Sequence, residues 1–177
     1  MSEERIHLEL ASLEHRQAAL AFKQEFIDAG ESVINGSALF DQMDFDGWIL
    51  NCKRNNRPET VRKNWAVAST FFGIRDSDGA IVGMIDVRHS LATPFLQQYG
   101  GHIGYSVRPS ERRKGYATAM LQLALDFCKS IGLDAVRIGC YSDNAASIGV
   151  IIACGGTLIE EKPYLDGNDM QVYRIAL

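Results

Sequence analysis

Residues 107–118 read Val-Arg-Pro-Ser-Glu-Arg-Arg-Lys-Gly-Tyr-Ala-Thr, and they join an apolar strand to an amphipathic helix. The strand ends at Pro109, a charged turn follows, and Gly115 opens the helix. The first backbone N–H groups of a helix have no partner within the helix, and the helix dipole is positive at this end. Because Gly115 and Ala117 leave these groups uncovered, the segment is typical of a binding site for a phosphate group.

Three cations, Arg112, Arg113 and Lys114, stand immediately before this helix. Cations at a helix N-terminus oppose the dipole, so they reduce stability unless an anion binds there. A nucleotide-phosphate binder is a disfavoured alternative, because a Walker loop needs Gly-Lys-Ser/Thr and a dinucleotide loop needs three spaced glycines. The remaining alternative to a phosphate site is an ordinary surface helix that begins with basic residues.

The helix itself is predicted by the spacing of its apolar residues. Ala117, Leu121, Ala124 and Cys128 lie on one face, and polar side chains occupy the other. Gly132 then ends the helix.

The loop before this helix fits the pattern Gln/Arg-x-x-Gly-x-Gly/Ala through Arg112, Gly115 and Ala117. In this it resembles the pyrophosphate loop of the GNAT acyltransferase superfamily, which holds acyl-coenzyme A. The resemblance covers nearly the whole chain and is strongest over residues 101–158. The order of strand, loop, helix, strand and asparagine-headed helix is more specific than the loop alone.

Asn144 matches the asparagine that commonly opens the GNAT helix beside the pantetheine arm, and Ser147 follows one turn later on the same face. The resemblance also implies that the backbone near the end of the fourth strand contacts the pantetheine and polarises the thioester carbonyl. The implied coenzyme-binding residues are Tyr105, Ser106, Val107, Arg112, Arg113, Lys114, Gly115, Tyr116, Ala117, Thr118, Asn144 and Ser147.

The chain as a whole is predicted to form one α/β domain over residues 1–177. Strands are expected at 6–10, 65–75, 80–89, 102–108, 133–140, 157–162 and 170–176, helices at 13–29, 43–52, 115–132 and 144–154, and a loop at 91–101. With the resemblance, this order, βααβββαβαββ, indicates a GNAT-like mixed and mostly antiparallel sheet of about seven strands with four flanking helices. The irregular stretch 31–64 would then form one wall of the acceptor site.

Acyl transfer to an amine needs groups that move protons. His102 heads the fourth strand and His89 ends the third, and each is a candidate base with a pKa near neutrality. Asp86 is a further candidate base. The alternative for either histidine is an ordinary packed or solvated residue.

The general acid is where the chain departs from the common GNAT pattern. Many family members place a tyrosine two turns after the helix-opening asparagine, and this chain has Ile151 there. A tyrosine acid at that position is therefore excluded. Tyr105, Tyr141, Tyr164 or solvent remain as proton donors to the leaving thiolate.

Composition narrows the classes of partner. The chain has 177 residues, 46% apolar content and a net charge of -4, which fits one domain without nucleic-acid or anionic-membrane partners. The four cysteines lack a Cys-x-x-Cys pair and the four histidines lack metal-binding spacing, so no metal is expected. We find no apolar run that matches a signal peptide or a membrane span, and therefore expect a cytoplasmic protein.

The sequence thus predicts an N-acyltransferase that moves an acetyl group from acetyl-CoA to a primary amine, by direct transfer in a ternary complex. The acceptor is a small, amino-acid-like amine or an exposed amino group. The stretch 31–63 mixes aspartates with lysines and arginines, so cationic and anionic acceptors both stay open, as does a homodimer through strand edges. The alternative is a non-catalytic acyl-CoA-binding or regulatory module, because the usual tyrosine and an obvious acidic base are missing.

Overall fold

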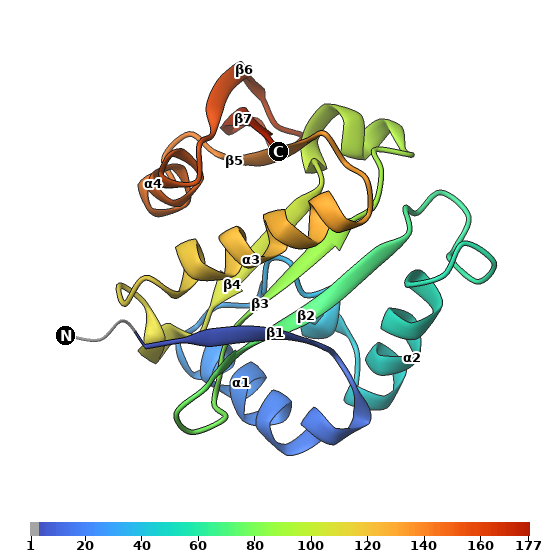
Figure 1. Cartoon of the computed structure of the whole chain (residues 1–177), viewed down its shortest axis with the longest axis vertical. Coiled ribbons are helices and arrows are strands. Elements are labelled where there is room, and N and C mark those ends of the chain that lie inside the picture. The colour runs from blue at the N-terminus through green and yellow to red at the C-terminus, as the bar shows by residue number, and fades with distance from the viewer. Residues whose placement is uncertain (1–3) are drawn as a thin grey trace.

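The computed structural model describes residues 4–177, and its elements follow the predicted order βααβββαβαββ (Figure 1). The strands are β1 (Ile6–Leu10), β2 (Ala68–Arg75), β3 (Ile81–Arg88), β4 (Ile103–Val107), β5 (Ala135–Tyr141), β6 (Thr157–Pro163) and β7 (Asp169–Ala176). The α-helices are α1 (Arg16–Asp28), α2 (Phe45–Asn55), α3 (Tyr116–Ser130) and α4 (Ala145–Ala153). Shorter helical turns span Leu13–His15, Phe40–Gln42, Leu96–Gly100 and Pro109–Glu111.

The strands form two hydrogen-bonded sheets rather than one continuous sheet. A four-stranded sheet has the order β1-β2-β3-β4, a three-stranded sheet has the order β5-β7-β6, and every pairing is antiparallel. Between Gly101 and Ile138 a bridge links the two sheets. Figure 1 shows the three-stranded sheet and α4 at one end of the molecule, beyond α3. The predicted strands and their antiparallel arrangement are confirmed, and the break falls between β4 and β5.

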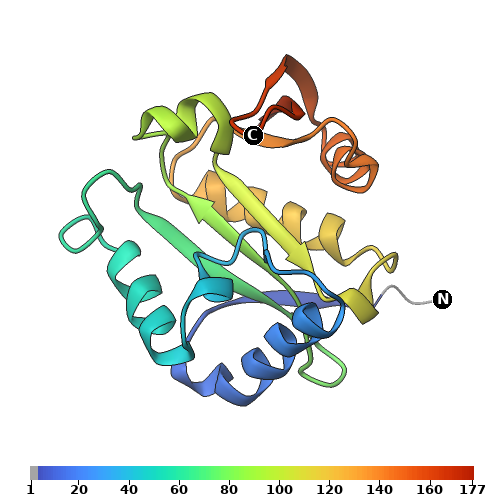
Figure 2. The same ribbon diagram turned by 180° about the vertical axis from the view of Figure 1, so that it is seen from behind.

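The four-stranded sheet has a helical layer on each face. Neighbouring side chains of a strand point to opposite faces. Phe71 and Ile85 therefore belong to the core formed with α3, whereas Phe72 and Met84 belong to the core formed with α1 and α2. Figures 1 and 2, seen from opposite sides, show α3 on one face of the sheet and α1 with α2 on the other.

The helix α3 begins and ends where its glycines predict. Gly115 precedes it with a φ of 84°, and Gly132 follows it with a φ of 86°. Such left-handed backbone favours glycine at helix boundaries. Leu121, Ala124 and Cys128 are fully buried, which confirms the predicted apolar face.

The start of one helix and one helical turn differ from the prediction. The helix α2 begins at Phe45, because the Asp44 carboxylate accepts the backbone N–H of Gly47 at 2.7 Å and caps the helix. Within the predicted loop before β4, Leu96–Gly100 form a π-helical turn. The hydroxyl of Thr93 accepts the first backbone N–H of this turn at 3.2 Å.

The segment between α1 and α2 crosses the sheet on its α1/α2 face (Figure 2). The indole Nε1 of Trp48, on α2, donates to the carbonyl of Ser37 at 2.7 Å and holds the segment in place. At Gly36 the segment lies so close to β4 that a Cβ atom there would be 2.1 Å from the carbonyl oxygen of Gly104. The helix α2 and this contact therefore fix the position of the segment over β4.

We expect Gly36→Ala to destabilise the fold more than Gly30→Ala. Both glycines have left-handed backbone, with φ of 69° and 76°, so the backbone conformation alone makes alanine cost about 1 kcal/mol at either position. Only at Gly36 does the new Cβ meet backbone atoms, and this overpacking costs about 1–3 kcal/mol more. Urea unfolding of the two variants measures the difference, and equal losses would contradict the close contact with Gly104.

Candidate functional site

A cavity of about 260 Å³ lies between β4 and β5, where the two strands separate. We call it the strand cavity. Residues of both strands and the start of α4 line it, together with four aromatic residues: Phe95, Tyr99, Tyr141 and Tyr164. The centroids of neighbouring rings in this group are 5.4 to 6.4 Å apart, so the rings form a continuous apolar wall.

The edge of β4 that faces the strand cavity carries backbone groups free of strand pairing. The backbone N–H of Arg108 donates to β3 at 2.8 Å, and the register then assigns the even-numbered residues of β4 to pairing with β3. The backbone groups of Tyr105 and the N–H of Val107 point the other way, towards the gap, whereas the Val107 carbonyl accepts a hydrogen bond from Arg112 Nε at 3.1 Å. Ser106, predicted as a third backbone contact, pairs with β3 instead, and its hydroxyl donates to the carbonyl of Asn35 at 2.7 Å.

His102 holds the point where β4 and β5 separate. Its backbone N–H donates to the carbonyl of Arg137 at 2.7 Å, and its ring Nδ1 accepts the Arg137 backbone N–H at 2.9 Å. The imidazole therefore takes the place of a backbone carbonyl at the last contact between the two sheets. This contact keeps the Arg137 N–H paired while the strands diverge.

The same contact limits what His102 can do as a base. Burial lowers its pKa, and the nearby charges of Arg137 and Arg88 lower it further. The ring is therefore neutral near pH 7, and its proton is on Nε2 because Nδ1 is the acceptor. The nitrogen that could take a proton is already bonded to the backbone. The geometry thus gives His102 a strand-positioning role.

His89, the other predicted base, lies on the opposite face of β3 from Asp86 and Arg88, as strand alternation requires. Its Nε2 is 2.9 Å from the hydroxyl of Ser69, and its ring packs 5.9 Å from that of Phe127 on α3. Burial lowers its pKa. His89 lines neither the strand cavity nor the cavity that adjoins it.

A second cavity of about 500 Å³ adjoins the strand cavity on the α1/α2 side of the sheet. We call it the side cavity. The two cavities share four lining residues: Asn35, Gly36, Arg88 and Phe95. A molecule in the side cavity therefore meets the contents of the strand cavity beside Arg88.

Asp86 and Arg88 form the charged floor of the side cavity. Asp86 is buried, its carboxylate accepts the Thr70 hydroxyl at 2.8 Å, and it forms an ion pair with Arg88 Nε at 3.0 Å. Burial raises the pKa of Asp86, although Arg88 and Thr70 oppose this shift. Within residues 4–177, Arg88 is the one cation that lines either cavity. Asp86 thus has the burial and the raised pKa that suit a general base.

Tyr105 is the tyrosine placed best to hold a proton near the strand cavity. Its hydroxyl is 2.9 Å from that of Ser147 on α4, and burial raises its pKa to about 12. Ile151, where many family members have tyrosine, is fully buried in the core. The Tyr141 hydroxyl instead donates to Asp166 at 2.7 Å, which raises the pKa of Tyr141 to about 12.

The start of α3 is bare, as the sequence predicts. No side chain caps the helix at Gly115, and a Cβ added there would find no atom within 4 Å. The first helical bond runs from Ala119 N to Gly115 O at 3.1 Å, so the N–H groups of the preceding three residues have no partner within the helix. These are Tyr116, Ala117 and Thr118. The arrangement fits an anion.

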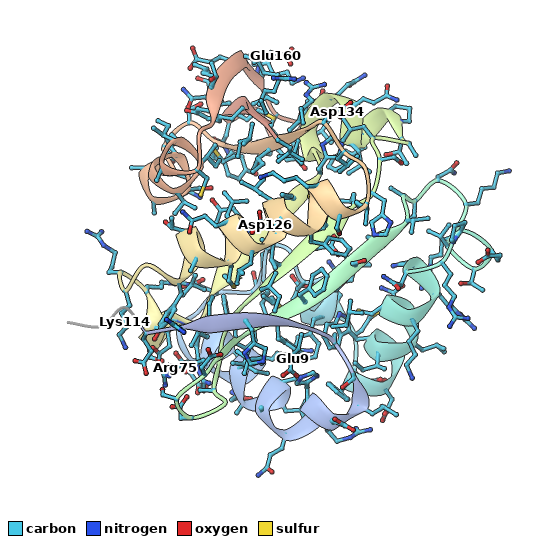
Figure 3. All side chains as sticks on the ribbon, viewed as in Figure 1. Glu9, Arg75, Lys114, Asp126, Asp134 and Glu160 are labelled. Carbon is cyan, nitrogen blue, oxygen red and sulfur yellow. The ribbon has the colours of Figure 1, made fainter. Side chains whose placement is uncertain are left out.

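The three cations before α3 do not act together. The Arg112 guanidinium binds both oxygens of Glu31 at 2.7 and 2.8 Å, and Lys114 binds Glu111 at 2.9 Å. Figure 3 shows Lys114 beside the turn that precedes α3. Arg113, whose φ is 65°, forms no ion pair within residues 4–177. Of the predicted charge contributions, only that of Arg113 remains free for a ligand.

Asn144 and Ser147 lie where the sequence predicts. The Asn144 side chain accepts the Ser147 backbone N–H at 3.1 Å and caps α4, and both residues line the strand cavity. Arg88, Asn35 and Gly36 also line the site and were not predicted from the sequence. Because side chains two residues apart in a strand share a face, Arg88 could have been placed on the same face as Asp86. No local sequence pattern indicates that Asn35 and Gly36 cross over β4.

Two features are absent from residues 4–177. No group of three or more His, Cys, Asp or Glu side chains is arranged to hold a metal ion. Among the helices of these residues, none has the length and apolar character needed to cross a membrane.

Comparison with known proteins identifies the domain type. The acetyltransferase (GNAT) domain family matches residues 5–157. No curated protein sequence matches this chain.

Several solved structures share the fold over nearly the whole chain. The microcin C7 self-immunity acetyltransferase, in complex with acetyl-CoA and AMP, has a TM-score of 0.71 at 19% identity, covering 99% of this chain and 94% of that one. The ribosomal L7/L12 alpha-N-protein acetyltransferase, in complex with coenzyme A, has a TM-score of 0.71 at 17% identity. The match covers 97% of this chain and 94% of that one. The ribosomal-protein-S5-alanine acetyltransferase from Vibrio fischeri has a TM-score of 0.71 at 18% identity. The match covers 99% of this chain and 95% of that one.

We expect the stabilising contribution of His102 to depend on pH. Because its pKa is lowered in the folded state, the contribution is complete above the unfolded pKa of about 6.5 and is lost as the pH falls. His102→Asn can still accept the Arg137 N–H but does not titrate. The excess unfolding free energy of the wild type over His102→Asn should therefore shrink from about pH 8 to about pH 5 in urea titrations. An excess that stays constant would show that the pKa of His102 is not lowered.

Proposed function

The chain belongs to the GNAT acetyltransferase family, and we propose that it moves the acetyl group of acetyl-CoA to a primary amine by direct transfer in a ternary complex. The amine belongs to a small molecule or is an exposed amino group. The observation that carries this proposal is the junction of two cavities beside Arg88, one between β4 and β5 and one under the α1–α2 segment. Two reactants can meet there without a covalent enzyme intermediate.

The described residues fit acetyl-CoA in three places. The uncovered N–H groups at the start of α3, with Arg113, suit the diphosphate. The backbone groups of Tyr105 and the N–H of Val107, which point to the gap, suit the amide groups of the pantetheine arm. Asn144 and Ser147 line the same cavity from α4. When bound, acetyl-CoA supplies a thioester, whose carbonyl carbon is open to an amine.

The transfer removes two protons from the acceptor nitrogen and adds one to the leaving thiolate, and we assign a residue to the first removal and to the addition. Asp86 takes a proton from the acceptor ammonium, which frees the nitrogen lone pair to form the new C–N bond. The acylated nitrogen then releases its remaining extra proton to solvent, the C–S bond breaks, and Tyr105 donates its proton to the departing thiolate and regains one from solvent. The raised pKa of Asp86 makes it a stronger base than an exposed aspartate, while Arg88 keeps its ionised form accessible.

We expect Gly115→Asp to lower the affinity for acetyl-CoA by about 100-fold or more, because a carboxylate would repel the diphosphate by several kcal/mol at close range. The left-handed backbone at Gly115 costs a non-glycine residue about 1 kcal/mol, and the open space around it meets no other atom, so the variant should stay folded. Gly132→Asp is the matched control: it lies at the other end of α3 with nearly the same φ, and its added Cβ also meets nothing within 4 Å. Calorimetric titration with acetyl-CoA compares the two, and unchanged affinity in Gly115→Asp would reject the diphosphate site.

We expect Asp86→Asn to lower kcat by about 100-fold or more while the affinity for acetyl-CoA is unchanged, because loss of a general base has an effect of this size. The wild-type rate should fall as the pH falls through the raised pKa of Asp86, since the base becomes protonated, and the variant should lack this limb. Thiol release from acetyl-CoA with a panel of amines measures both effects.

Asp41→Asn is the matched control for this experiment. Asp41 lines the same cavity, but its carboxylate accepts the backbone N–H of Ile34 at 3.0 Å. A normal kcat in Asp86→Asn would reject Asp86 as the base. A wild type that binds acetyl-CoA but releases no thiol with any amine would favour the non-catalytic alternative.

A further inference from the structure

The acidic residues near the side cavity are already engaged within the protein. Asp44 caps α2, Asp46 forms an ion pair with Arg16, and Asp41 accepts a backbone N–H at 3.0 Å. Asp86 at the floor is paired with Arg88. These four carboxylates therefore have partners before any acceptor binds, whereas the exposed Glu59 forms no ion pair within residues 4–177.

The cations of the same wall are not engaged in this way. Five of them lie between residues 53 and 63, and all are exposed: Lys53, Arg54, Arg57, Arg62 and Lys63. We call this stretch the basic rim. Nine of the 18 Lys and Arg residues of the chain form ion pairs with residues in the described part, and five of the other nine are in the basic rim. In a chain with a net charge of -4, this is a marked local excess of free positive charge.

The basic rim is next to the side cavity in the chain, although none of its five cations lines that cavity. It includes Asn55, which lines the side cavity, and ends just before Asn64 and Trp65, which also line it. Figure 1 shows this part of the chain as the end of α2 and the loop that leads into β2. A third cavity of about 480 Å³ is lined by Lys53, Arg54 and Arg57.

This third cavity connects the basic rim to the proposed base. Besides the three cations, it is lined by Thr70, whose hydroxyl donates to the Asp86 carboxylate at 2.8 Å. The two cavities therefore reach Asp86 and its partner Thr70 from neighbouring sides. Three cations of the basic rim therefore line a cavity that reaches Thr70, the residue bonded to Asp86.

Helix stability alone does not explain these charges. Lys53 and Arg54 lie in the last turn of α2, where cations interact favourably with the helix dipole. Arg57, Arg62 and Lys63 lie beyond the helix and gain nothing from it. Like charges placed this close repel one another, so their grouping reduces stability unless an anion binds.

We infer that the acceptor amine is carried by an acidic peptide segment, whose carboxylates bind the basic rim while its amino group enters the side cavity. This inference rests on the proposed function and names the acceptor class for it. The cations are spread along a stretch of chain rather than gathered at one point, so they match several separated negative charges better than one phosphate. The net negative charge of the protein disfavours the dense charge of a nucleic acid.

The orphaned amide of Asn55 supports an acceptor with hydrogen-bonding groups. Asn55 is 3% exposed and lines the side cavity, and its side-chain oxygen has no hydrogen-bond partner within residues 4–177. A buried polar atom without a partner is costly, and a bound peptide backbone or amino group would satisfy it.

The experiment compares acceptor peptides that share the same first two residues and differ in the next six, which are acidic, neutral or basic. We expect the acidic peptide to have a kcat/KM at least about 10-fold above that of the neutral peptide, and the advantage to fall with added salt. Equal rates for the three peptides, or a preference for the basic peptide, would overturn the inference while leaving acetyl transfer intact. Transfer to no amine at all would reject the proposed function itself. If an oligonucleotide or inorganic phosphate inhibits the reaction and an acidic peptide does not, the inference of an acidic peptide acceptor is overturned in favour of those anions.

Charge-reversal variants test the basic rim directly. Arg54→Glu with Arg57→Glu should lower kcat/KM for the acidic peptide by about 10-fold or more and leave that for the neutral peptide within about two-fold. The double variant Arg62→Glu with Lys63→Glu changes two residues outside α2, so it repeats the test without altering the helix. Lys129→Glu with Arg174→Glu, on the exposed surfaces of α3 and β7, is the matched control. An acidic-peptide rate that is unchanged in both rim variants would overturn the inference.

Discussion

The separation of β4 from β5 creates the strand cavity and leaves one edge of β4 without a strand partner. His102 and Arg137 make the last contact between the two sheets through a backbone bond and a ring bond. A buried backbone group left unpaired is costly, so the imidazole lets the strands diverge without an orphaned N–H at the vertex. Beyond this point the edge of β4 is free, and proteins normally cover such edges. In our proposal the extended arm of acetyl-CoA covers it.

The sheet then divides the chemistry between its two faces. Strand alternation places Asp86 and Arg88 under the α1–α2 segment and places His89 against α3. The segment itself is held by Trp48 and by the close approach of Gly36 to β4. The side cavity and the strand cavity can therefore adjoin at Arg88, which is what transfer between two bound reactants needs.

Charge is arranged differently at the two anion-binding regions. Before α3, Glu31 and Glu111 neutralise two of the three cations, so the attraction for a diphosphate comes mainly from uncovered N–H groups, the helix dipole and Arg113. Along the basic rim the cations have no such partners, and the attraction is long-ranged and sensitive to salt. The first arrangement suits one small ligand in a fixed position, and the second suits a larger and more variable partner.

Local sequence patterns were sufficient for the element order, the boundaries of α3, the bare helix start at Gly115 and the cap of α4 by Asn144, because caps, glycines and apolar spacing act within a few residues. They were not sufficient for the proton-transfer groups or for the state of the charges. His102 is engaged by Arg137 and Arg112 by Glu31, and Asp86 is buried beneath residues 33–42, which are distant from it in the sequence. Burial and pairing depend on the distances between residues far apart in the chain, and a linear pattern does not encode those distances.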